Sequence, residues 1–125
     1  MEAQTRQVRL LTTSSTQALV NMGHVLQAAG CDHRHVVKTT VLLQDIDHFP
    51  LVDAVYGEVF AEAPPARATF QVPWEGKMGQ VAALPRGALV EVEAVAVVGD
   101  LQHVARAALL AGFFTIIAFI AYCLK

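Results

Sequence analysis

The chain has 125 residues, of which 54% are hydrophobic and 16% are charged, and its formal net charge is −2. This length suits one small α/β domain whose stability would gain from association with further copies. The lack of a basic excess disfavours nucleic acid as a main partner. Cys31 and Cys123 lie far apart with no CxxC pair and no secretory signal before them, so a reducing compartment, the cytosol, is expected.

Residues 1–15 contain Arg6, Arg9 and the polar cluster 12–15, with no apolar period long enough for a signal peptide. We expect a poorly ordered N-terminal arm that ends in a helix-capping cluster. A mitochondrial presequence is the alternative, which would place the protein in the mitochondrion. Glu2 and the shortness of the arm disfavour it.

Helices and strands are predicted to alternate after this arm. Apolar residues at spacings of three and four predict a helix over 16–29, which ends at Gly30. A second amphipathic helix is predicted from Pro50 to Phe60. Runs rich in β-branched residues, or alternating in polarity, predict strands over 36–43, 66–72 and 88–98.

The segment after the second predicted strand interrupts the pattern with a proline and two glycines. Gln80-Val81 then repeats Gln71-Val72 nine residues later. This repeat indicates an inserted loop over residues 73–80.

The C-terminal region differs in character from the rest. Residues 107–124 form a stretch of eighteen residues without a charge, between Arg106 and Lys125. Because the stretch is apolar all round, we predict an apolar helix within 102–125. Its length is at the lower limit for crossing a bilayer, so it would either act as a membrane tail anchor or pack on the domain or on another copy.

Arg67 stands two residues after a Pro-Pro pair, at the start of a predicted strand. A guanidinium there can bind a carboxylate through two hydrogen bonds. The alternative is a strand-end arginine in a surface ion pair.

Glu91 and Glu93 alternate with valines, so both carboxylates project from one face of the last predicted strand. They are either solvated charges or, at the end of an otherwise apolar row, a candidate base or water-orienting group. The His33-x-His35 pair and nearby His48 have no further ligand at metal-binding spacing. A polar turn is predicted there, and no metal or cofactor site.

Several motifs occur in an order that resembles the RidA/YjgF family of imine deaminases. They occupy residues 21–23, 28–32, 36–41, 45–49, 55–56, 65–67 and 90–96. The resemblance extends over about residues 16–101, which defines the predicted domain. The family's N-terminal β-hairpin has no counterpart in the chain before Thr16. The inserted loop and the apolar tail are, conversely, foreign to the family.

The resemblance implies a chorismate-mutase-like α+β fold, a mixed sheet packed by two helices, incomplete at the N-terminus. It also implies a homotrimer with sites between subunits that hydrolyse 2-imino acids to 2-keto acids and ammonia without a cofactor. By the family's motifs, Arg67 would bind the substrate carboxylate and Glu91 would position water. Asp53 falls on a substrate-binding helix position that is often asparagine in the family.

Two alternative functions are considered, one from the differences between this chain and the family pattern and one from the family itself. One is a non-catalytic variant that uses the scaffold for association, held at a membrane by residues 107–124. The other is ribonuclease or translation-inhibitor activity, which the family has been credited with. The lack of a basic surface and of an aromatic stacking motif disfavours this last function.

Overall fold

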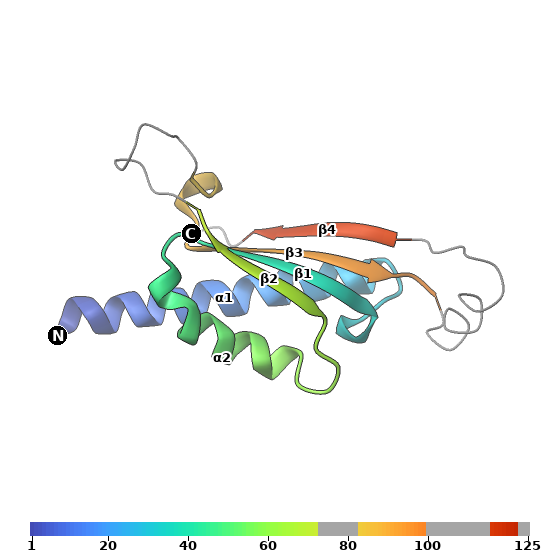
Figure 1. Ribbon diagram of the computed structural model, residues 1–125, viewed down its shortest axis with the longest axis horizontal. Helices are drawn as coiled ribbons and strands as arrows, with labels where there is room; N and C mark the ends of the chain where they lie inside the picture. Colours follow the sequence, from blue (N-terminus) through green and yellow to red (C-terminus); the bar gives the residue numbers. More distant parts are fainter. Residues whose placement is uncertain (73–82, 100–115, 123–125) are drawn as a thin grey trace.

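The computed structural model describes residues 1–72, 83–99 and 116–122 (Figure 1). Its helices are α1 (Glu2–Ala28) and α2 (Phe49–Val59), with short 3-10 turns η1 (His33–His35), η2 (Ile46–His48) and η3 (Pro85–Gly87). Its strands are β1 (Val36–Leu43), β2 (Ala66–Gln71), β3 (Val90–Val97) and β4 (Ile116–Tyr122).

The described strands form one mixed sheet in the order β2-β1-β3-β4. β1 and β2 run parallel, whereas β3 is antiparallel to both β1 and β4. Helices α1 and α2 lie on the same face of this sheet (Figure 1). The observed layers therefore confirm the predicted mixed sheet packed by two helices.

The hydrophobic core fills the space between the helices and the sheet. Alternate residues of each central strand point into it, and the helices contribute residues three and four apart, as the sequence pattern predicts. The largest fully buried apolar side chains are Leu11, Met22, Leu26, Val41, Leu43, Val90 and Val92. The opposite face of the sheet carries no described helix (Figure 1).

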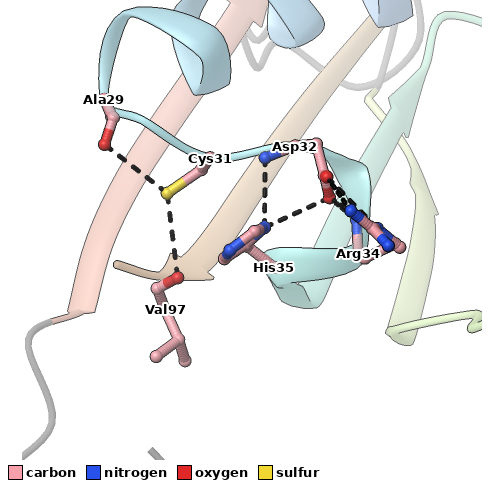
Figure 2. Close-up of polar contacts among 6 residues, drawn as sticks. All are labelled: Ala29, Cys31, Asp32, Arg34, His35 and Val97. Atoms are coloured by element: carbon pink, nitrogen blue, oxygen red, sulfur yellow. Dashed lines mark hydrogen bonds and ion pairs between the residues drawn. The ribbon is translucent and has the colours of Figure 1, made fainter. Parts of the chain in front are cut away.

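The connection from α1 to β1 is fixed by the polar residues that follow Gly30 (Figure 2). Gly30 has a φ of 73°, in the left-handed region that favours glycine, and it ends the helix as predicted. Asp32 Oδ1 then accepts a hydrogen bond from the Arg34 amide at 2.8 Å, and the Asp32 amide donates to His35 Nδ1 at 3.1 Å. The Arg34 side chain lowers the pKa of Asp32 well below its usual range.

The N-terminal arm was predicted wrongly, because α1 begins at Glu2 instead of near Thr16. The hydroxyls read as capping groups bond back along the helix: Thr12 Oγ1 donates to the Val8 carbonyl at 3.0 Å, and Ser15 Oγ to the Leu11 carbonyl at 2.8 Å. Such bonds satisfy the hydroxyls without ending the helix. Leu11 is also buried, so these early turns belong to the core.

The predicted C-terminal helix is corrected in part, because Ile116–Tyr122 forms strand β4. The segment is rich in β-branched and aromatic residues, and β3 offers it a row of backbone groups to pair with. Ile116 lies opposite Val97 and Tyr122 opposite Glu91 in this pairing. The remaining residues of 102–125 and the predicted loop 73–80 lie outside the described residues. Within the described part, neither helix has the length and apolar character that crossing a bilayer needs.

Candidate functional site

Arg67 lies on β2, and its guanidinium packs against α2. Nη1 is 2.7 Å from Asp53 Oδ1, and Cζ lies 5.2 Å from the centre of the Phe49 ring and 4.6 Å from that of Tyr56. The three partners are four and three residues apart on α2, so they share one face of the helix. The guanidinium is therefore held by one ion pair and two cation–π contacts.

Tyr56 provides a rigid support for this arginine. Its side chain is buried, and its hydroxyl lies 2.7 Å from the Thr39 hydroxyl on β1. Burial raises the pKa of Tyr56, so the phenol stays neutral. Thr39 lies beside Arg67 in the parallel register of β1 and β2. Both side chains are therefore on the helix-covered face of the sheet, where they meet Tyr56 of α2.

An open cleft of about 660 Å³ borders Arg67 on this face. Its wall consists of Ile46, Asp47, Phe49, Pro50, Arg67 and Thr69. The Arg67 side chain is 26% exposed and lines the cleft, and a guanidinium carries N–H donors beyond the one that Asp53 accepts. A guanidinium in an apolar and aromatic cleft is suited to binding a small carboxylate.

Sequence reasoning identified Arg67 and Asp53 but not the aromatic residues that flank them. Phe49 and Tyr56 were interpreted only as part of an amphipathic helix. Their spacing around Asp53 was the available signal, because residues at i, i+4 and i+7 lie on one side of a helix. Thr69 was also missed, although it alternates with Arg67 and so lies on the same face of the strand.

Glu91 lies in a different environment, on the face of the sheet away from the helices. It pairs with Leu42 on β1, and the residues before and after it, Val90 and Val92, point into the core. Glu91 itself is 6% exposed. Burial, and to a smaller extent the neighbouring charge of Glu93, raise its pKa above the ordinary value of a glutamate.

The structure therefore does not bring Arg67 and Glu91 together within one chain. Arg67 shares the helix-covered face with Thr39, whereas Glu91 shares the opposite face with Leu42. Glu93 pairs with Thr40 and lies on the same face as Glu91, as the alternation predicts. Asp53 is the predicted site residue that does contact Arg67.

Fold and sequence together define a member of a known class of small α+β proteins. The sequence profile of the family described as Endoribonuclease L-PSP matches residues 2–98. The chain belongs to this family, which is also known as the RidA/YjgF family, and the predicted chorismate-mutase-like fold is confirmed.

A curated relative narrows the comparison to one kind of enzyme. The human 2-iminobutanoate/2-iminopropanoate deaminase is 52% identical over 85 residues, which cover 68% of this chain and 56% of the relative. The chain thus spans little more than half the length of that protein.

Solved structures agree with this assignment. One is a putative endoribonuclease L-PSP from Entamoeba histolytica, 45% identical with a TM-score of 0.56, covering 66% of this chain and 58% of the other. Another is the YjgF gene product of E. coli, 34% identical with a TM-score of 0.56, covering 66% and 60%. Both sequence identities are higher than a shared fold alone would require.

Proposed function

We propose that the protein hydrolyses 2-imino acids, such as 2-iminopropanoate and 2-iminobutanoate, to 2-keto acids and ammonia. The observation that carries this proposal is the guanidinium of Arg67, supported by two aromatic rings beside an open cleft. The name of the human relative supplies the substrate class. The reaction needs no cofactor, because an iminium carbon is already electrophilic.

Arg67 binds the substrate carboxylate and fixes the orientation of the adjacent C=N bond. Water then attacks the iminium carbon, the π electrons move to nitrogen, and a carboxylate accepts the proton that water releases. The same carboxyl group returns the proton to the amino nitrogen of the tetrahedral intermediate. As the intermediate collapses, the same carboxylate takes the hydroxyl proton, the C–N bond breaks, and ammonia leaves the carbonyl of the keto acid. The carboxyl group then passes this proton to the departing ammonia, which is released as ammonium and restores the carboxylate.

Glu91 is the proposed carboxylate. Its raised pKa suits a group that must both accept and return a proton. Since Arg67 and Glu91 occupy opposite faces of one sheet, a shared site requires Arg67 of one copy and Glu91 of another. We therefore propose a cyclic homotrimer, in which every interface joins the two residues.

A dehydratase generates 2-aminoacrylate from serine in situ, and the release of keto acid is followed over time. The purified chain is expected to accelerate release above the uncatalysed rate. Arg67→Ala is expected to lose this acceleration. Arg9→Ala serves as its matched control, because it removes an exposed arginine of α1 that lies outside the cleft. An uncatalysed rate that the parent chain leaves unchanged refutes the proposed activity and favours a non-catalytic scaffold.

A further inference from the structure

Asp53 forms an ion pair with Arg67, the residue that is proposed to bind the substrate carboxylate. We propose that this carboxylate makes the cleft select a 2-iminium acid, which carries a cation, over the 2-keto acid, which carries none. The inference deepens the proposed function and rests on Arg67 as the carboxylate-binding group. It concerns how the same cleft distinguishes its substrate from its product.

The geometry allows Arg67 to bind two carboxylates at once. Asp53 Oδ1 approaches Nη1 at 2.7 Å, and a guanidinium carries further N–H donors on its other nitrogens. The Phe49 and Tyr56 rings hold the planar group in place. A ligand carboxylate that binds those further N–H donors therefore lies close to the Asp53 carboxylate.

Two carboxylates on one guanidinium repel each other. The net interaction of the ligand with Asp53 therefore depends on whether the ligand also carries a positive charge. In a 2-iminium acid the cationic nitrogen is two bonds from the carboxylate carbon, so it can approach Asp53 and donate a hydrogen bond to it. In the keto acid an oxygen replaces that nitrogen. The keto acid thus keeps the repulsion and loses the attraction.

The charges around the cleft act in the same direction. Asp47 lines the cleft together with Arg67, and Asp53 contacts the guanidinium from α2. Among the described residues that line the cleft, Arg67 is the one guanidinium or ammonium group. A plain anion therefore enters a site with more negative than positive charge, whereas a zwitterion does not.

Two stable molecules of matched size test the inference: 2-aminobutanoate, which carries an ammonium group beside its carboxylate, and 2-oxobutanoate, which carries a ketone. Their dissociation constants are measured by NMR titration of the full chain. The parent is expected to bind 2-aminobutanoate more tightly. Asp53→Asn is expected to tighten 2-oxobutanoate binding about three- to tenfold without tightening that of 2-aminobutanoate, the range typical of one partly exposed charge pair.

Glu58→Gln is the matched control, because it removes one negative charge from the exposed side of the same helix, outside this cleft. It is expected to leave the ratio of the two dissociation constants unchanged. Asp53→Ala is the second variant in case the asparagine variant folds poorly, since alanine favours helix. A ratio that neither Asp53 variant alters, or that Glu58→Gln alters equally, overturns the inference.

These measurements use molecules that do not react, so they separate the inference from the proposed function. A parent chain that prefers the zwitterion through Asp53 but does not accelerate imine hydrolysis would refute the deaminase activity alone. An active enzyme with an unaltered ratio in the Asp53 variants would refute the role of Asp53 alone. Arg67→Ala is expected to weaken binding of both molecules, which ties the effect to this cleft.

Discussion

The two faces of the sheet place their charged residues in different environments. On the helix-covered face, Arg67 is surrounded by groups from α2 that pair with it and stack on it. On the other face, Glu91 is buried between neighbouring strands beside a second carboxylate. The charge of Arg67 is thus paired and flanked by aromatic rings, whereas burial favours the neutral form of the Glu91 carboxyl group.

This difference has a consequence for assembly. A face covered by helices can build a binding cleft from one chain, because the helix supplies the second wall. Glu91 lies on the opposite face, which carries no described helix (Figure 1), so the proposed site needs Glu91 from a second copy to meet a substrate on Arg67. The proposed site is therefore complete only in the oligomer.

Removing the cation of the helix-covered face is expected to have the largest effect. Arg67→Ala should lower kcat/KM by at least about a hundredfold, because it removes the group that orients the substrate. Arg67→Lys should recover only part of this loss, since an ammonium group cannot form the paired hydrogen bonds of a guanidinium. The keto-acid release assay measures both. Full activity of Arg67→Ala would show that the carboxylate binds elsewhere.

Removing the carboxylate of the opposite face should have a large effect on rate and a contrasting effect on stability. Glu91→Gln is expected to lower kcat about a hundredfold, as for the loss of a general base. Because the folded-state pKa of Glu91 is raised, the parent loses stability as pH rises from the ordinary pKa of 4.5 through the raised value.

Glu91→Gln should therefore stabilise the fold at pH 7 relative to its effect at pH 4. Denaturant unfolding at the two pH values measures this difference. Glu93→Gln provides a comparison on the same face of the same strand. A stability difference between parent and Glu91→Gln that stays constant with pH would contradict the burial of an ionisable carboxyl group at this position.

The helix-covered face also depends on the early turns of α1. Leu11 is 1% exposed and adjacent Leu10 is 45% exposed, so the pair offers a matched test. Leu11→Ala is expected to lower the free energy of unfolding by about 2–4 kcal/mol, whereas Leu10→Ala should change it by less than about 1 kcal/mol. Equal effects would indicate that this part of α1 does not pack on the domain.

The smallest effect is expected from the support beneath Arg67. Tyr56→Phe keeps the ring but leaves the Thr39 hydroxyl buried without that partner, and should lower the free energy of unfolding by about 1–2 kcal/mol. Adding Thr39→Val should restore most of the loss, since two apolar groups then replace the hydrogen-bonded pair. Calorimetric unfolding of the single and double variants checks this, and additive losses would argue against a shared hydrogen bond.

Much of the fold could be predicted because its signals are local. The β-branched run Val36–Leu43 became β1 with the predicted bounds, and Gly30 ended α1. The same local reasoning failed where tertiary pairing decides the outcome. Ile116–Tyr122 is apolar enough for a helix, but pairing with β3 makes it a strand.

The sequence supplied the residues of the proposed site but not their geometry. The family motif pointed to Arg67, Glu91 and Asp53, and helix spacing could have added the aromatic rings. The faces on which Arg67 and Glu91 lie depend on how β2 and β3 each pair with β1. A shift of one residue in the pairing of β2 with β1 would reverse the face of Arg67, and the mostly exposed residues of β2 offer no apolar alternation that would specify its register, unlike the valines that flank Glu91.

Subunit complementation tests the central claim most directly. Purified Arg67→Ala and Glu91→Gln chains, each expected to be about a hundredfold less active than the parent, are mixed in equal amounts, unfolded and refolded together. If each site joins Arg67 of one copy to Glu91 of another, random assembly should restore about a quarter of the parent activity, because about one interface in four receives both intact residues. A mixture as inactive as its components would contradict a site shared between copies.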